Sequence, residues 1–393
     1  MSSCSHCLLD TNHPFKPSFV DGVCNSCIKR SASARSKIDL RNLLDSQNRS
    51  GKRYDCIVVL KGTPEDYFVI GVILELGFYP LCVFVNSYFS TDICWKNVHN
   101  LIHKFDLELR TFNPNLTHYR KMVKYSLRRF SDVLTPSKLL TFRYVMNLSE
   151  SLNVNVIISG ENQVAKNSGK FLQQKLPECT AWSVLEHDGH TTSHDFFGPS
   201  LDLPQIIKSQ YNPLNLNNSL TKWVFLSDFL RWDQLQQDFD ALADGAIGQL
   251  EETTFDLCHR AGSSVFYRFH DLLRYQKFRS IKATDQLSRE IRMGRIKKTI
   301  AIQLNNRFIS ETLQAERVES VLEDVCCWLG LKTEAVKWIK HHKLPEPVES
   351  TGITKSECLE WYIRILGRER SEVEPRIFSP LAHFCRYYKG AEI

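Results

Sequence analysis

The chain has 393 residues, of which 42% are apolar and 11% aromatic, and it carries a formal net charge of +6. These values predict a globular protein with two hydrophobic cores and a small appended module. No segment approaches the roughly 18 uncharged apolar residues that a membrane-spanning helix needs, which excludes membrane insertion. Charges of both signs alternate along the chain, which argues against nucleic acid as a partner but permits an anionic substrate such as a nucleotide-sugar.

The N-terminal stretch "MSSCSHCLLD" has no basic region followed by an apolar one, so we expect a cytoplasmic protein. Its 13 cysteines are spread through a long chain, and most of them should be reduced.

Four cysteines near the N-terminus form two C-x-x-C pairs that are separated by 16 residues. They are Cys4, Cys7, Cys24 and Cys27. Each pair can hold one metal ion from a tight turn, and four thiolates complete a tetrahedral zinc site with no open position. The spacing predicts a structural zinc knuckle over residues 1–30. His6 and His13 are not needed as ligands, so we expect both at the surface.

Residues 31–53 are polar, serine-rich and basic at both ends, which predicts a linker with one short helix in "IDLRNLLDSQ". From Tyr54 the pattern changes. "DCIVVL" predicts a buried strand, "DYFVIGVILELG" a helix that ends at Gly77, and "PLCVFVN" a second buried strand.

Helices and strands continue to alternate up to residue 160. Helices are predicted in "CWKNVHNLIHKFD", "YRKMVKYSLRRF" and "SKLLTFRYVMNLSESLN", and strands in "LELRTFNPN" and "VNVIISGEN". This alternation predicts an α/β domain over residues 54–220, with a parallel sheet covered on both faces and ligands bound beyond the carboxyl ends of the strands. The loops "LKGTPED" and "SGEN" lie at such ends.

Residues 166–219 show few clear periods and are interpreted as an irregular insertion. Within them, the loop from His187 to His194 is rich in histidine, but its spacing matches no metal-site pattern, so we expect a solvated loop. Residues 221–393 are predicted to be mostly helical, because apolar residues recur at spacings of three and four.

Several motifs in this order resemble the N-acetyl sugar amidotransferases, which are PP-loop enzymes of bacterial surface-polysaccharide and flagellar-glycan biosynthesis. They are the cysteine knuckle, "YDCIVV", "FVN", "LRTFNPN", "SGEN", "LRWD" and "YQKFRSIKATDQLSREIRMGRI". The resemblance covers most of the chain, is most specific from Lys277 to Ile296, and is weakest between Lys166 and Ser219. It implies that the α/β domain has the PP-loop, adenine nucleotide alpha hydrolase-like fold.

The resemblance also implies a reaction. In that family, ATP adenylates the acetamido oxygen of a sugar, and ammonia from a glutaminase partner displaces AMP to leave an acetamidino group. An amide oxygen is a poor leaving group, so it must become a phosphate ester before a neutral amine can replace it. The implied cofactors are structural zinc and, in an active enzyme, ATP with magnesium, while ammonia-channelling subunits are implied partners.

The family's loop surrounds pyrophosphate with backbone N–H groups at a helix N-terminus. Here the loop departs from the pattern of serine, two glycines, any residue, aspartate and serine. Gly62 is kept, Glu65 keeps an acidic character, and Pro64 removes an N–H donor. Lys61 can replace lost donors with a point charge, whereas Glu65 and Asp66 would repel a triphosphate unless magnesium lies between them.

The predicted nucleotide-binding residues are Lys61, Gly62, Glu65, Asp66, Gly160, Glu161 and Asn162. Three interpretations of the altered loop stay open. It binds ATP through altered contacts, it binds another ligand such as the nucleotide-sugar alone, or the chain is an inactive relative that keeps the fold for assembly.

A basic segment near residue 290 is predicted to bind the anionic substrate. Arg289 and Arg292 lie three residues apart, so on a helix they share a face, and Arg295 continues the row. Guanidinium groups form planar bidentate contacts with a phosphate or a uronic-acid carboxylate. Lys277 and Asp285 are weaker members of this set, and the alternative interpretation is a solvated basic helix.

The leading hypothesis is an ATP-dependent sugar amidotransferase, or a diverged relative, that acts on an acetamido sugar. One alternative is a tRNA-modifying protein, because tRNA-thiolating PP-loop enzymes also begin with a zinc knuckle. The modest net charge and the segment from Lys277 argue against it. The other alternative is a non-catalytic scaffold.

Overall fold

The computed structural model describes residues 2–14, 17–28, 36–46, 52–160, 221–250, 253, 256 and 266–378. The predicted insertion, together with Glu161, Asn162 and the loop from His187 to His194, lies outside the described residues.

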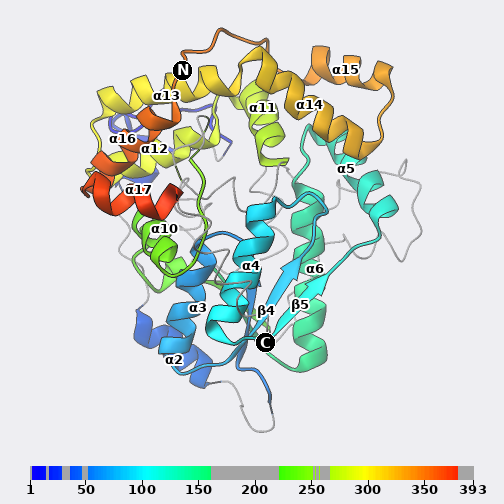
Figure 1. Ribbon diagram of the computed structural model, residues 1–393, viewed down its shortest axis with the longest axis vertical. Helices are drawn as coiled ribbons and strands as arrows, with labels where there is room; N and C mark the ends of the chain where they lie inside the picture. The colour runs from blue at the N-terminus through cyan, green and yellow to red at the C-terminus, as the bar shows by residue number, and fades with distance from the viewer. Residues whose placement is uncertain are drawn as a thin grey trace.

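A five-stranded parallel sheet forms the centre of the α/β domain (Figure 1). Its strands are β3 (Cys56–Leu60), β4 (Pro80–Val85), β5 (Leu109–Phe112), β6 (Val156–Ser159) and β7 (Lys222–Phe225). They lie in the order β5-β4-β3-β6-β7, so the order reverses between β3 and β6. The predicted fold class is confirmed. Strand β7 was not predicted, because it lies at the start of residues 221–393, whose apolar spacing predicted helices.

Helices cover both faces of the sheet. They are α2 (Lys37–Asp45), α3 (Glu65–Glu75) and α4 (Asp92–Phe105) on one face and α6 (Thr135–Leu152) on the other, whereas α5 (Leu116–Phe130) packs with α6 and the C-terminal helices. Successive side chains of a strand point to opposite faces. Cys56, Val58 and Leu60 of β3 therefore pack in one cluster with α3 and α4, whereas Ile57 and Val59 pack in another with α6.

Helix α2 confirms the short helix that was predicted within the linker. Its Leu40 and Leu44 are fully buried in the cluster that contains α3 and α4. Arg41 donates a hydrogen bond to the carbonyl of Leu76 at the end of α3 (3.0 Å). This part of the linker is therefore packed onto the α/β domain.

The C-terminal region is mostly helical, as predicted. It contains η3 (Leu226–Asp228), α10 (Gln234–Ala243), α11 (Phe266–Phe278), α12 (Lys282–Arg292), α13 (Lys298–Thr312), α14 (Ala315–Leu329), α15 (Thr333–Lys343), α16 (Lys355–Leu366) and α17 (Arg370–Phe378). Helices α11 and α14 share a core with α5, and α10 packs against α3. Figure 1 shows the helices from α11 onward as a layer beyond the carboxyl ends of the strands.

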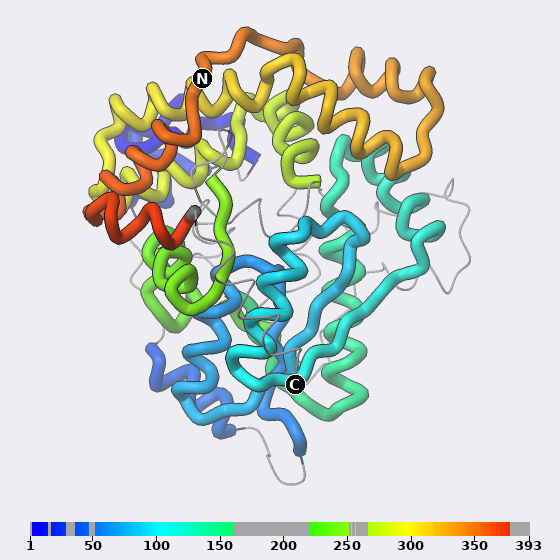
Figure 2. The backbone as a smooth tube through the Cα atoms, viewed as in Figure 1, coloured from blue at the N-terminus to red at the C-terminus, as the bar shows by residue number. Residues whose placement is uncertain are grey.

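The N-terminal module is a small hairpin, β1 (Phe19–Val20) and β2 (Val23–Cys24), followed by α1 (Asn25–Ile28). It lies among the C-terminal helices rather than beside the sheet, as the blue end of the tube shows in Figure 2. Ile291 of α12 packs against its cysteines. Among the described residues, none of the helices combines the length and the hydropathy that a membrane crossing requires.

Candidate functional site

The carboxyl ends of β3 and β6 lie side by side at the centre of the sheet, where the strand order reverses. Strand β3 leads into Lys61 and Gly62, and β6 leads into Gly160. In open α/β sheets, ligands bind in the crevice at this position. The structure thus places Gly160, the described part of the second predicted loop, next to Glu65 of the first.

The backbone amides of the first loop are bonded to a carboxylate of the chain itself. Asp66 Oδ2 accepts hydrogen bonds from the amides of Lys61 (2.9 Å), Gly62 (2.7 Å) and Thr63 (3.3 Å). Gly62 has a φ of 74°, a left-handed conformation that directs successive N–H groups to one point, and a β-carbon there would clash with Cys94. This nest of amides at the start of α3 is the type of site that binds phosphate, and Asp66 fills it.

Glu65 fills a second part of the crevice. Its carboxylate lies against Gly160, where a β-carbon would overlap it. Lys61 Nζ donates to both carboxylate oxygens of Glu65, at 3.2 and 3.4 Å. Glu65 and Asp66 are only 6% and 4% exposed, so both acidic groups are enclosed by the protein. The lysine that was predicted to contact phosphate is therefore paired with Glu65.

Enclosure changes the titration of these groups. Burial, together with the charge of Glu65, raises the pKa of Asp66 to about 7. The charge of Lys61 and the hydrogen bonds from the amides act in the opposite direction but are weaker. Burial alone would lower the pKa of Lys61, but the charges of Glu65 and Asp66 outweigh burial and raise it. Lys61 therefore remains a cation at neutral pH.

A third buried carboxylate, Asp238 in α10, was not singled out from the sequence. Asp238 is 1% exposed, and its Oδ1 accepts a hydrogen bond from Gln234 (2.6 Å). Burial and the charge of Asp256 raise its pKa well above the usual range, Glu65 raises it further, and Arg289 opposes them. Its environment therefore favours the protonated carboxyl. Its place on the apolar stripe of α10 was the signal available in the sequence.

Helix α12 and the turn after it carry two of the predicted substrate-binding arginines. Arg289 makes a bidentate contact with Asp256 (2.9 and 2.6 Å), and its Nε donates to Glu290 (2.6 Å). Arg295 donates to Glu290 (3.0 Å) and to Asp233. Because Glu290 is 0% exposed, these arginines serve as its counter-charges. Binding of substrate by Arg289 and Arg295 stays a prediction.

The weaker members of that set have structural partners. Lys277 donates to the carbonyl of Phe130. Asp285 is buried and bonds to Arg274 (2.9 and 3.0 Å) and to His13 (2.7 Å). Burial alone would raise the pKa of Asp285, but the charge of Arg274 and the contact with His13 hold it well below the usual range. The prediction that His13 lies at the surface was wrong. The residue is 1% exposed, because its ring is hydrogen-bonded to these buried polar groups.

The four predicted metal ligands come together in the N-terminal module. Their Sγ atoms all lie within 4.8 Å of one another, with 3.6 Å between Cys7 and Cys24 and 3.9 Å between Cys4 and Cys27. A tetrahedron with metal–sulfur bonds of about 2.3 Å needs sulfur atoms about 3.8 Å apart. The amides of His6, Cys7 and Cys24 donate to Cys4 Sγ at 3.3 to 3.4 Å. The cluster therefore fits a single ion with no open position.

Arg292 lies toward this cluster rather than with Arg289 and Arg295. Hydrogen bonds with Cys24 and Cys27 lower the pKa of Cys7 to about 2, and the charge of Arg292 lowers it further. Nη1 of Arg292 is buried without a hydrogen-bond partner among the described residues. Four thiolates around a divalent ion leave a negative charge that a nearby guanidinium reduces.

Comparison with known proteins gave a match to a family model and matches to solved structures. Residues 251–345 match a family model described as LPS biosynthesis protein WbpG-like, C-terminal domain. Among solved structures, the chain is similar to the U34-tRNA thiolase NcsA from Methanococcus maripaludis with its [4Fe-4S] cluster, at 12% identity and a TM-score of 0.31, over 91% of this chain and 96% of that chain. None of the curated proteins matched. Only the family match bears on function, and it links helices α11 to α15 with lipopolysaccharide biosynthesis.

The raised pKa of Asp66 predicts a pH-dependent stability. Because the native state holds this proton up to pH about 7 and the unfolded state releases it near pH 4, the free energy of unfolding should fall as the pH rises through this window. Asp66→Asn should make that fall shallower by at least about 1 kcal/mol between pH 5 and pH 8. Urea unfolding at several pH values measures it. Asp92→Asn, an exposed position in the first turn of α4, is the control, and parallel curves for native protein and Asp66→Asn would contradict the assignment.

The cysteine geometry predicts one zinc ion and no iron per chain in protein purified without added metal. Cys24→Ser should release the zinc and lower the melting temperature, because one of four ligands is lost. Cys327→Ser changes an exposed cysteine of α14 and should leave the zinc content unchanged. Elemental analysis and thermal unfolding provide the measurements. Stoichiometric iron with sulfide, or disulfides among the four cysteines, would refute the zinc assignment.

Proposed function

We propose that this chain is a surface-glycan biosynthesis protein of the N-acetyl sugar amidotransferase type, whose own carboxylates replace ATP phosphates at the loop after β3. The family match over residues 251–345 supports the glycan assignment, and the sequence motifs support an acetamido sugar as its substrate. The observation that carries the proposal is the Asp66 carboxylate in the amide nest.

ATP would have to displace this carboxylate. Asp66 accepts three amide hydrogen bonds, and each contributes about 0.5–1.5 kcal/mol to the protonated carboxyl and about 1.5–3 kcal/mol to the carboxylate. The displaced group and Glu65 would then lie beside a triphosphate and repel it. Lys61, the cation of the loop, already neutralises Glu65. The loop therefore favours its closed form over the ATP complex.

A closed loop has a chemical consequence. Without adenylation the acetamido oxygen stays a poor leaving group, and ammonia has no route to displace it. The chain in this form binds the sugar without forming AMP. We therefore propose a role beside a catalytic amidotransferase and its glutaminase, in which this chain supplies substrate binding.

Opening the nest should restore phosphate binding. Asp66→Ser removes the carboxylate, frees three amides, and introduces the serine of the family pattern. We expect ATP and pyrophosphate to bind at least tenfold more tightly than to the native chain, which corresponds to about 1.4 kcal/mol. Isothermal calorimetry with magnesium present, together with an assay for AMP, gives both readouts. Asp92→Ser makes the same chemical change at the start of α4 and should alter neither.

A second variant covers the case in which one substitution is insufficient. It replaces Lys61 to Asp66 by serine, glycine, glycine, lysine, aspartate and serine, and it should bind ATP more tightly still. Tight ATP binding and AMP formation by the native chain would reject the closed-loop proposal.

A further inference from the structure

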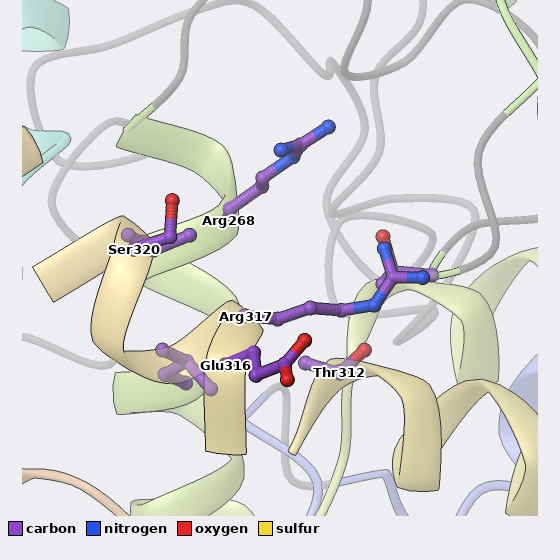
Figure 3. Close-up of a pocket in the computed structure, with 8 residues that line it drawn as sticks. Arg268, Thr312, Glu316, Arg317 and Ser320 are labelled. Carbon is purple, nitrogen blue, oxygen red and sulfur yellow. The ribbon is translucent and has the colours of Figure 1, made fainter. Parts of the chain in front are cut away.

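A cavity of about 190 Å³ opens between α11 and α14, beside the end of α13 (Figure 3). It lies apart from the loop after β3 and entirely within the segment that matches the family model. The lining residues are Thr253, Arg268, Leu272, Thr312, Glu316, Arg317, Ser320 and Val321. None of these residues was predicted from the sequence to bind a ligand.

The two arginines come from different helices. Figure 3 shows Arg268 of α11 and Arg317 of α14 extending toward the same side of the cavity, with Glu316 and Thr312 beside Arg317 and with Ser320 nearer Arg268. Two guanidinium groups that approach one space from separate elements can grip an acidic group from two directions.

Arg317 is held in a defined direction. Its Nε donates to Gln314 (2.9 Å), and its Nη2 lies 3.5 Å from Glu311. Glu311 is 2% exposed, lies outside the lining, and also accepts hydrogen bonds from Ser350 (2.5 Å) and from the amide of Ile353 (3.2 Å). These contacts orient the guanidinium before a ligand arrives, which lowers the entropy lost on binding.

The lining contains more hydrogen-bond donors than acceptors. Each guanidinium carries five N–H groups, whereas Glu316 is the acceptor-only side chain of the lining. Threonine and serine hydroxyls can pair with sugar hydroxyls, and Leu272 and Val321 offer an apolar surface to a methyl group. The cavity volume of about 190 Å³ leaves room for a small polar ligand.

We propose that this cavity binds an acidic acetamido sugar, with Arg268 and Arg317 gripping its carboxylate or phosphate. Glu316 and the hydroxyl side chains bind the sugar hydroxyls, and the apolar wall receives the acetamido methyl group. The sugar part of this inference rests on the proposed function. The inference that the two arginines bind an anion is independent of the proposed function.

The experiment uses the full chain and three probes, namely N-acetylglucosamine 1-phosphate, N-acetylglucosamine and inorganic phosphate. Calorimetry should show the sugar phosphate binding at least tenfold more tightly than the neutral sugar. Arg268→Gln and Arg317→Gln should each weaken it at least tenfold, and Arg317→Lys should weaken it as well, because lysine keeps the charge but loses the bidentate fork. Arg307→Gln is the matched control, since Arg307 of α13 pairs with Glu357 (2.8 Å) outside the cavity and should leave binding unchanged.

Arg268 is largely exposed, so its replacement tests the site even where Arg317→Gln fails to fold. Sugar phosphate binding that is unaffected by both glutamine variants would overturn the inference. So would salt-sensitive binding of tRNA that falls in both variants while the sugar phosphate does not bind. Loss of inorganic phosphate binding in both variants, with no preference for the sugar, would keep the anion site and reject the sugar. The ATP measurements on Asp66→Ser are independent of every one of these outcomes.

Discussion

The organisation of the crevice depends on one interaction, the carboxylate of Asp66 in the amide nest after β3. The first amides of a helix lack partners within that helix, and three converging N–H groups need an anion or a water. Here the partner comes from the first turn of the same helix, three to five positions along the chain from each donor. Donors and acceptor lie close together in the chain, so the carboxylate is present at a high effective concentration whenever the loop forms. It therefore competes with any phosphate for the amides.

The other charges around the crevice are matched in the same way. Lys61 pairs with Glu65, Arg289 pairs with Asp256 and Glu290, Arg295 pairs with Asp233 and Glu290, and Arg274 pairs with Asp285. Asp238 has no ion pair with a described residue, and burial raises its pKa. Buried ion pairs of this type resist the loss of either member, because the remaining charge would stay buried and unpaired. The charged side chains between the sheet and the C-terminal helices are therefore paired with other side chains of the same protein.

The metal module connects the N-terminal residues with α12 and α13. His13 and the amide of Leu8 bond to Asp285 and Ser288 of α12, and Lys298 bonds to the carbonyl of Cys4 (2.6 Å). An ion that fixes the four cysteines thus also fixes the surface on which α12 lies.

The sequence by itself determined what short-range patterns encode. Two C-x-x-C turns predicted the metal ligands, apolar spacing predicted the helices and most strands of the sheet, and strand ends predicted which loops meet at its centre. Only the tertiary structure decided which partner each charge has, because Arg289 and Asp256 lie 33 positions apart and His13 and Asp285 lie 272 apart. The periodic spacing of apolar residues carries no information about such pairs. The cavity between α11 and α14 likewise exists only once two helices pack, and the Asp66 contact depends on a loop conformation that the residue types allow but do not fix.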